Sequence, residues 1–482
     1  MIFVSSQNNE ISKLNRGTFH SQANPELCVL DLSFNEISKI PYDTFRFPKL
    51  ERLLLDDNRI DSIESKAFVE MTGLRFLSLE GNNLQMLPDE AFQNLHYLSH
   101  LNLAFNDLQL LDFAAFDSIG TLSHLSIDLS HNALQSLRTN RTTSYPTSSN
   151  IMSLDLSSNN ISYVEVAFFH PVQNVLKMLN LSRNSLTEIN PESLGHIRKL
   201  HSIDLSHNLL INIDQGTFFA SKKLQAVYLH NNALSDLNPG LFGNHRDLKI
   251  VDLSRNRLST LPEQLFQRTS LEIFRAADNR LHEIPIKTLN PVQSTLKHLD
   301  LTGNRITTIS DSQLNQIQSL VMLNLARNQI TIIDDQAFCC LPNLAWLDLS
   351  FNPLKRIDAN TFAGVKGHLQ VLRIANTSLT QMSSFQLPHL KTLNVSSNHL
   401  TFVPANTLAN LSDVRELDLS HNELTTPPSS AWHTMHHLRT LNLAGNPITQ
   451  VMNDSFLGLD KLEFLDILDI TAKQYQVRCY AN

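Results

Sequence analysis

The sequence is a tandem repeat, and the short period of that repeat constrains the fold more than any other feature. One copy reads Leu-x-x-Leu-x-Leu-x-x-Asn-x-Ile, as in residues 50–60 (LERLLLDDNRI). The asparagine usually recurs every 24 residues, with extreme steps of 21 and 27, at positions 35, 58, 82, 106, 132, 159, 184, 208, 232, 256, 279, 304, 328, 352, 398, 422 and 446. Thr377 replaces it once. With a worn copy at each end, we predict a single array of about twenty repeats over residues 1–482.

Each part of the repeat has a physical meaning. Leu-x-Leu has period two, which predicts a short strand with both leucines facing inward. One repeat cannot bury that face alone, so neighbouring repeats must stack into a continuous core. The asparagine amide offers two donors and an acceptor to backbone groups that turn inward after the strand. A bulky apolar residue lies ten positions after most of the asparagines, and this recurrence predicts a second buried stripe. These residues are Phe at 19, 45, 68, 92, 116, 169, 218, 242, 266, 338, 362 and 456, Trp432, and Leu at 194, 289, 314 and 408.

Repeats such as residues 27–49 (LCVLDLSFNEISKIPYDTFRFPK) resemble the typical 24-residue class of leucine-rich repeats. The resemblance implies an α/β solenoid of horseshoe shape, with a parallel β-sheet on the concave side and an irregular convex side. The class occurs mostly in extracellular proteins such as Toll receptors, Slit-like ligands and adhesion molecules. The long array, the few cysteines and residues 371–400 are most similar to the chaoptin group of cell-surface adhesion proteins. Toll-receptor ectodomains are the next most similar group.

The ends of the chain depart from this class, which usually carries cysteine-rich caps. Cys28 stands alone near the start and Cys479 near the end. An uncapped solenoid end would expose an apolar face. The start of the sequence shows no signal peptide. The sequence also contains no apolar run of about 18 residues, the length needed to span a bilayer. We therefore expect a fragment of a longer cell-surface protein, attached to the plasma membrane only through parts missing from this chain. The alternative is a complete cytosolic protein.

Catalytic and ligand-binding motifs are missing from the sequence. It contains no Walker A, G-x-G-x-x-G, H-E-x-x-H or G-x-S-x-G motif, and only 13 glycines. The net charge of −8 disfavours nucleic acid. His433, His436 and His437 lack a nearby cysteine to complete a zinc site. Cys339 and Cys340 could form a vicinal disulfide or remain buried thiols, and we favour thiols. We expect no enzyme, catalytic residue, cofactor, metal or small-molecule substrate.

The sequence contains seven N-x-S/T sequons, about as many as chance gives. If the protein is secreted, they are possible glycosylation sites: Asn140, Asn160, Asn180, Asn376, Asn394, Asn410 and Asn453. Asn140 is the favoured acceptor, because it lies in a Ser- and Thr-rich insertion at residues 138–150 that we expect to form a surface loop. Asn180 and Asn394 lie within predicted strands, where glycans would cover part of the sheet face.

A partner-binding patch is predicted from the outward residue between the two leucines, which is usually Asp or Asn. Leu54, Tyr228, Arg275 and Arg373 break that preference with large side chains. Tyr228, Asp252 and Arg275 belong to consecutive repeats, with His230 beside them. Tyr and Arg are enriched in binding hot spots, so these four residues, Tyr228, His230, Asp252 and Arg275, form the predicted contact. The alternative is an Asp252–Arg275 surface ion pair of little energetic weight beside a packed tyrosine.

Two functions are consistent with the sequence. The first is a cell-surface or extracellular adhesion and recognition protein. Its repeat surface, on the order of 90 Å long, would bind a protein partner, a second copy of the chain being one candidate. The alternative is an intracellular scaffold or inhibitor that uses the same surface. A glycosidase-induced mobility shift of the native protein supports the first, and its absence supports the second.

Overall fold

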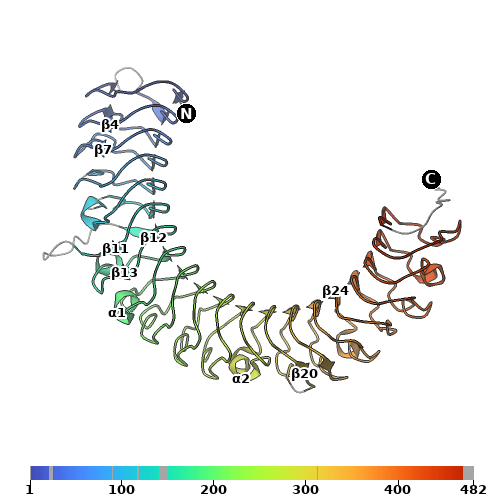
Figure 1. Cartoon of the computed structure of the whole chain (residues 1–482). Coiled ribbons are helices and arrows are strands. Elements are labelled where there is room, and N and C mark those ends of the chain that lie inside the picture. Colours follow the sequence, from blue (N-terminus) through green and yellow to red (C-terminus); the bar gives the residue numbers. More distant parts are fainter. Residues whose placement is uncertain are drawn as a thin grey trace. The chain divides into compact units, whose positions relative to one another are not determined.

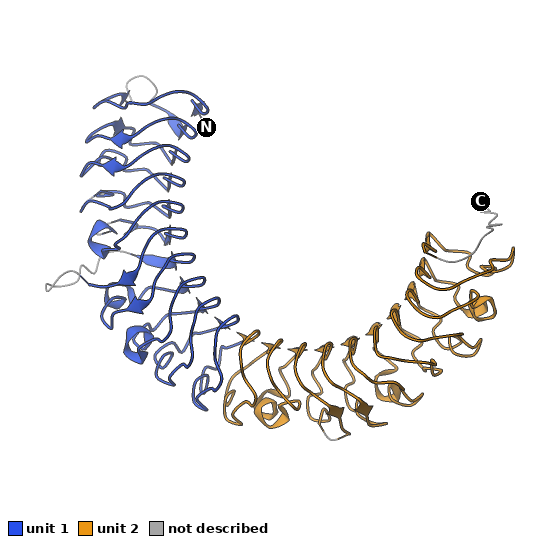
Figure 2. Ribbon diagram, viewed as in Figure 1, with its two compact units in different colours: residues 1–250 blue, residues 251–482 orange. Residues whose placement is uncertain are grey.

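The computed structural model describes residues 2–20, 25–89, 91–116, 119–139, 150–311 and 313–469. The chain divides into two compact units, residues 1–250 and residues 251–482 (Figures 1 and 2). In each unit the repeats form successive turns of a solenoid, with one short strand per turn on the same side. The solenoid of parallel strands that the repeat predicts is therefore confirmed in both units.

In unit 1 the strands of the main sheet are parallel, and equivalent residues of successive repeats lie opposite one another. For example, Leu53 pairs with Leu77, and Leu77 with Leu101. Because each strand is only a few residues long, its contribution depends on both neighbours. The strands are β1 (Ile2–Ser5), β3 (Leu27–Asp31), β6 (Arg52–Leu54), β8 (Phe76–Ser78), β9 (His100–Asn102), β10 (Leu125–Asp128), β12 (Ile151–Asp155), β14 (Met178–Asn180), β15 (Ser202–Asp204) and β16 (Ala226–Tyr228).

Unit 2 repeats the same arrangement. Strand β17 (Ile250–Asp252) begins at the boundary between the units. The strands that follow are β18 (Ile273–Arg275), β19 (His298–Asp300), β21 (Met322–Asn324), β23 (Trp346–Asp348), β24 (Val371–Arg373), β25 (Thr392–Asn394), β26 (Glu416–Asp418), β27 (Thr440–Asn442) and β28 (Phe464–Asp466). Leu347 pairs with Leu323 on one side and with Leu372 on the other, so the repeat register is again kept.

The wall opposite the main sheet is irregular in both units, as the sequence predicts, because a 24-residue repeat leaves little room for helices. Its short strands pair as β2 (Phe19–His20) with β5 (Phe45–Arg46), β4 (Lys39–Ile40) with β7 (Ser62–Ile63), β11 (Ser136–Leu137) with β13 (Tyr163–Val164), and β20 (Thr308–Ile309) with β22 (Ile332–Ile333). Its helical turns are α1 (Pro191–Leu194), α2 (Ile286–Leu289), η1 (Phe113–Phe116), η2 (His170–Val172), η3 (Asn290–Val292), η4 (Ala363–Val365) and η5 (Ser429–Thr434).

The core of each unit lies between these two walls. The inward leucines of the strands are buried, except Leu465 of β28, and so are most residues of the predicted second stripe, including Trp432. In unit 1 the phenylalanine rings stack in a row, with Phe68 lying 6.0 Å from Phe45 and 6.0 Å from Phe92, measured between ring centroids. The interplanar angles of 7° and 10° show that the rings are nearly parallel. The predicted second buried stripe is therefore confirmed.

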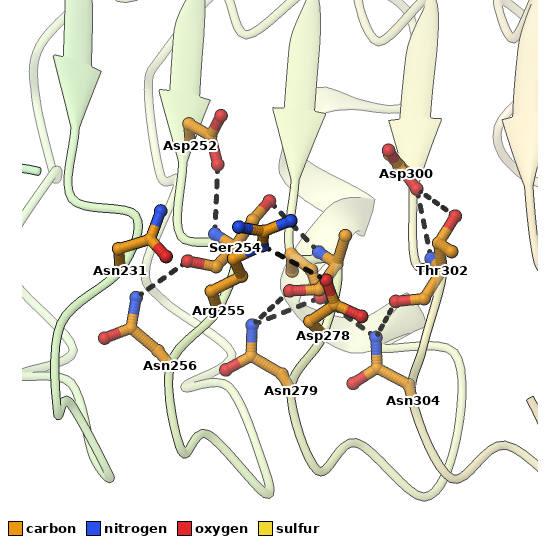
Figure 3. Close-up of polar contacts among 12 residues, drawn as sticks. Asn231, Asp252, Ser254, Arg255, Asn256, Asp278, Asn279, Asp300, Thr302 and Asn304 are labelled. Atoms are coloured by element: carbon orange, nitrogen blue, oxygen red, sulfur yellow. Dashed lines mark hydrogen bonds and ion pairs between the residues drawn. The ribbon is translucent and has the colours of Figure 1, made fainter. Parts of the chain in front are cut away.

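The asparagine column pairs inward-facing backbone groups, as predicted (Figure 3). The amide nitrogen of Asn279 donates to the carbonyl oxygens of Ala276 and Ala277 in its own repeat and of Leu253 in the preceding repeat, at 2.9–3.2 Å. Its side-chain oxygen accepts the backbone N–H of Leu258 at 3.0 Å. Asn279 therefore links two adjacent repeats.

Thr377, which interrupts the column, makes only part of this set of bonds. Its hydroxyl donates to the Ile374 carbonyl at 2.9 Å. The side-chain oxygen of Asn398 in the next repeat accepts the backbone N–H groups of both Thr377 and Leu379, each at 2.9 Å. The following asparagine therefore serves two backbone groups where the column is broken.

Candidate functional site

The outward residue between the two leucines of each strand has a structural role in most repeats. In unit 2 the Asp252 carboxylate accepts the backbone N–H of Ser254 at 3.0 Å, and Asp300 accepts that of Thr302 at 3.0 Å (Figure 3). Asparagine does the same, since Asn394 accepts the N–H of Ser396 at 2.9 Å. The preference for Asp and Asn thus follows from the need for an acceptor that closes the turn after the strand.

Two repeats of unit 2 replace that acceptor with arginine, and a serine of the preceding repeat compensates. The backbone N–H of Ala277 donates to the Ser254 hydroxyl at 3.2 Å, and that of Ala375 donates to the Ser350 hydroxyl at 3.1 Å. Arg275 and Arg373 are thereby released from any role in the turn.

Each of these arginines lies beside the aspartate of the preceding strand. The nitrogen–oxygen distances are 3.8 Å for Arg275–Asp252 and 4.0 Å for Arg373–Asp348. Pairs of this kind at a surface contribute about 1 kcal/mol or less to stability. In these repeats an exposed guanidinium group therefore replaces the side chain that closes the turn elsewhere. The ion pair that it forms adds little stability in return.

The serine compensation can be tested by Ser350→Ala. We expect local stability around β24 to fall by about 1–2 kcal/mol, because the Ala375 N–H, which is buried, loses its acceptor. Hydrogen exchange of the peptide that contains residues 371–377 measures this effect. Ser420→Ala is the control, since among the described residues that hydroxyl bonds only to Asp418 of its own turn, at 2.6 Å, and its loss should change local stability by about 0.5 kcal/mol or less. Equal effects of the two variants would contradict the compensation.

Arg373 belongs to a cluster of aromatic and basic side chains on the sheet face of unit 2. Its guanidinium lies 5.6 Å from the ring centroid of Trp346. The guanidinium of Arg327 lies 4.7 Å from the ring centroid of Phe351, whose side chain is 45% exposed. We call Arg327, Trp346, Phe351 and Arg373 the Trp346 cluster.

Apolar neighbours extend the cluster across three adjacent strands. In the parallel register Met322 of β21 lies opposite Trp346 of β23, and Trp346 lies opposite Val371 of β24. Beside the cluster is an open hollow of about 580 Å³, whose wall includes Phe351, Arg373, Asp418 and Phe464. The arrangement combines solvent-accessible apolar groups with charges of both signs, which is the composition of a protein-binding surface.

The predicted patch falls on both sides of the division between the units. In unit 1, Tyr228 ends β16 opposite Asp204, and both Tyr228 and His230 are half-buried. The His230 ring packs edge-on against His207, with centroids 5.3 Å apart. In unit 2, Asp252 and Arg275 form the ion pair that was the alternative interpretation. That these four residues form one contact site remains a prediction.

Sequence reasoning noticed Arg373 but missed the rest of the Trp346 cluster, because it considered only the position between the leucines. Trp346 precedes that position by two residues, and Phe351 and Arg327 directly precede the column asparagine. All these positions face the sheet surface or its edge. Comparing every outward position across neighbouring repeats would have found the cluster.

The sequons differ in how accessible their side chains are. Asn160, Asn376 and Asn453 are exposed, whereas Asn180 and Asn394 end strands and accept the backbone N–H two residues later. Asn410 is half-buried and donates to the Ser384 hydroxyl at 3.4 Å. Asn140 and most of the 138–150 insertion lie outside the described residues. Glycosylation of these seven asparagines remains a prediction.

Cys339 and Cys340 are free thiols in the structure, with sulfur atoms 2.9 Å apart. Both are half-buried rather than fully buried. The hydrogen bond with Cys340, and burial to a smaller extent, raise the pKa of Cys339 to about 11, which keeps this thiol protonated at neutral pH. Cys28 in β3 is also a free thiol, and Cys479 lies outside the described residues.

The described part of the chain brings no three His, Cys, Asp or Glu side chains into an arrangement that could hold a metal ion. It also contains no helix with the length and apolar character needed to cross a membrane.

Two curated relatives are similar to part of the chain. Over 301 residues it is 40% identical to chaoptin of Drosophila melanogaster, covering 61% of this chain and 23% of that protein. Over 273 residues it is 44% identical to chaoptin of Tribolium castaneum, covering 56% of this chain and 35% of that protein. The chain thus spans about a quarter to a third of the length of these relatives.

Solved structures of proteins from an insect, a bacterium and the mouse have similar folds. The Toll–Spatzle complex of Drosophila matches with a TM-score of 0.68 at 22% identity, over 83% of this chain and 53% of that one. A leucine-rich repeat protein of Leptospira interrogans matches with a TM-score of 0.65 at 25% identity, over 94% and 99%. The mouse RP105/MD-1 complex matches with a TM-score of 0.64 at 20% identity, over 99% and 75%.

The leucine rich repeat family matches most of the sequence, in overlapping segments. These are residues 6–60, 25–84, 48–108, 74–134, 149–210, 198–258, 222–281, 294–354, 367–424 and 388–448. The matched residues are those that form the strands, the asparagine column and the buried stripes described above. The chain therefore belongs to the leucine-rich repeat family.

Proposed function

We propose that the chain is the recognition part of a cell-surface or extracellular adhesion protein, and that it binds a protein partner through the Trp346 cluster on the sheet face of unit 2. A second copy of the chain is one candidate for that partner. The observation that carries the proposal is the replacement of a turn-closing Asp or Asn by Arg373, which lies against the half-buried Trp346 and lines the same hollow as the exposed Phe351. A repeat that departs from its structural rule is a place to look for function.

The chemistry of the cluster supports a protein partner. Trp and Arg dominate binding hot spots, because each contributes a large contact area together with a polar group. Stacking of Arg373 on Trp346 and of Arg327 on Phe351 orders these side chains before binding, which lowers the entropy lost on association. The hollow beside them is open rather than enclosed, so a small molecule would remain largely exposed to solvent there.

The relatives support the proposal at two levels. The chaoptin proteins share 40% and 44% identity with parts of the chain, and the resemblance implies cell-surface adhesion. Toll and RP105, which share the fold, were solved in complexes with Spatzle and MD-1. Recognition of a protein by a leucine-rich repeat solenoid is the common feature of these two complexes.

A matched pair of variants tests the site. Arg373→Asn removes the guanidinium and supplies the turn acceptor found in other repeats, so we expect the fold to be unchanged or slightly stabilised. We expect about tenfold or greater loss of partner binding from Arg373→Asn, and a similar loss from Trp346→Ala. Arg275→Asn is the control, because its repeat has the same Asp, Ser and Ala arrangement but lies outside the Trp346 cluster.

The measurement is aggregation in suspension of labelled cells that display the chain, mixed with unlabelled cells that do not. Aggregates of labelled cells alone indicate a second copy as partner, and mixed aggregates indicate a different protein. If Arg373→Asn and Trp346→Ala cells aggregate like the parent, the Trp346 cluster is not the contact. If Arg275→Asn alone abolishes aggregation, the patch predicted from the sequence is favoured instead. A glycosidase-induced mobility shift of the native protein would support the cell-surface function, and its absence would support the intracellular alternative.

A further inference from the structure

Three arginines form a row on the flank of unit 2, at the position directly after the column asparagine. Arg257, Arg280 and Arg305 occupy this position in successive repeats, and all three are exposed. The backbone N–H of Arg280 donates to the carbonyl of Leu258, and that of Arg305 donates to the carbonyl of Leu281, each at 2.8 Å. These bonds place the three backbone positions about 5 Å apart in sequence order. We call Arg257, Arg280 and Arg305 the arginine ladder.

The guanidinium groups of the ladder have no ion-pair or hydrogen-bond partner among the residues that the structure describes. Other exposed arginines commonly have one, such as Arg59 with Glu36 at 2.8 Å and Arg439 with Glu463 at 3.1 Å. Three adjacent unpaired cations repel one another, and they stand out in a chain of net charge −8. Such an arrangement is favourable only when an anion neutralises it.

Nearby carboxylates leave the ladder unneutralised. Asp278, which lies beside it, pairs with Arg255 at 3.4 Å. Glu263 pairs with Lys287 at 3.2 Å, in the wall of a hollow further along the same flank. Glu283 lines that hollow too, and it makes no ion pair with the ladder. The flank therefore keeps an excess of positive charge over three repeats.

The surroundings of the ladder indicate which kind of anion fits. Two positions further along each repeat, the exposed residues are Ser259, His282 and Thr307, which are polar. A protein interface would need an apolar anchor at its centre, and binding of single-stranded nucleic acid relies on aromatic stacking platforms. Neither is present at these described positions. Guanidinium groups bind sulfate-like and carboxylate groups through paired hydrogen bonds.

We propose that the arginine ladder binds an acidic polysaccharide that carries sulfate and carboxylate groups. The row of guanidinium groups matches a chain with anions at regular intervals, and the polar surroundings suit a polymer of hydroxylated sugars. The ladder is separate from the Trp346 cluster, so the glycan and the protein partner would use different surfaces. Binding should weaken as ionic strength rises, because the contacts are between exposed charges.

The test measures binding of a heparin-derived hexasaccharide to the full chain by titration calorimetry at physiological ionic strength. In the ladder variant, Arg257, Arg280 and Arg305 are each replaced by Gln. In the control variant, the exposed residues Arg198, Arg356 and Arg439, which do not adjoin one another, are replaced by Gln. Both variants lose three positive charges at exposed positions, so folding should be kept, and thermal unfolding verifies this. We expect about tenfold or greater weakening in the ladder variant and less than about twofold in the control.

Three results would overturn the proposal. The first is that the parent chain does not bind the hexasaccharide at all, and the second is that the ladder and control variants weaken hexasaccharide binding equally. The third result is that a competitor of matched charge binds the ladder more strongly than the hexasaccharide does. The competitors are a polyglutamate peptide and a single-stranded oligonucleotide, which represent the other classes of polyanion. Trp346→Ala should leave hexasaccharide binding unchanged. The glycan proposal and the proposed protein-binding site therefore succeed or fail separately.

Discussion

Phe68→Ala is expected to lower the free energy of unfolding of unit 1 by about 3–5 kcal/mol. The ring is fully buried, and it is stacked between Phe45 and Phe92 with centroids 6.0 Å away on each side. Its removal leaves a cavity between three repeats and interrupts the row of rings. Repeat proteins are stabilised by interfaces between neighbours, so the loss affects the two flanking repeats as well.

The measurement is urea unfolding of the full chain, combined with hydrogen exchange to locate the loss in unit 1. Phe34→Ala is the matched control, since that ring is 51% exposed and its removal should cost about 0.5 kcal/mol or less. A cost for Phe68→Ala close to that of the control would mean that the stacked row contributes little. Loss of protection confined to residues far from 45–92 would also contradict the argument.

The buried parts of the fold could be predicted because stacking imposes the same requirement on every repeat. The strand leucines, the asparagine column and the phenylalanine row recur at fixed offsets, so one repeat explains all the others. Spacing alone places even the exceptions Trp432 and Leu194 in the buried stripe, and both are buried. The sequence also shows that Thr377 breaks the column, but the double use of the Asn398 oxygen depends on the neighbouring repeat.

The candidate site could not be predicted in the same way, because it depends on contacts between repeats rather than on the repeat itself. The sequence shows that Arg373 replaces Asp or Asn, but not that Ser350 of the preceding repeat satisfies the turn. The stacking of Arg373 on Trp346 joins side chains that are 27 positions apart. Each outward surface position is free to vary between repeats, so no periodic rule indicates which of them act together.

Asn208→Ala is expected to lower the free energy of unfolding by about 1–3 kcal/mol, because it leaves buried backbone groups of two repeats unpaired. The Asn208 amide nitrogen lies 2.9 Å from the Leu181 carbonyl of the preceding repeat and 3.1 Å from that of Leu205. Its side-chain oxygen accepts the Leu186 N–H at 3.0 Å. The side chain is almost completely buried, so water cannot readily replace these bonds.

Asn208→Thr distinguishes lost hydrogen bonds from lost packing, because the chain itself uses threonine at this position once. The Thr377 hydroxyl keeps one bond to a carbonyl of its own repeat, at 2.9 Å, so we expect Asn208→Thr to cost less than Asn208→Ala. Asn83→Ala, at an exposed position next to the column, is the control and should change stability by about 0.5 kcal/mol or less. Urea unfolding of the three variants measures the free energy of unfolding that each one loses, and so ranks them. An Asn208→Ala effect as small as that of the control would mean that the column does not hold adjacent repeats together. Equal costs for alanine and threonine would assign the loss to packing rather than to the unpaired backbone.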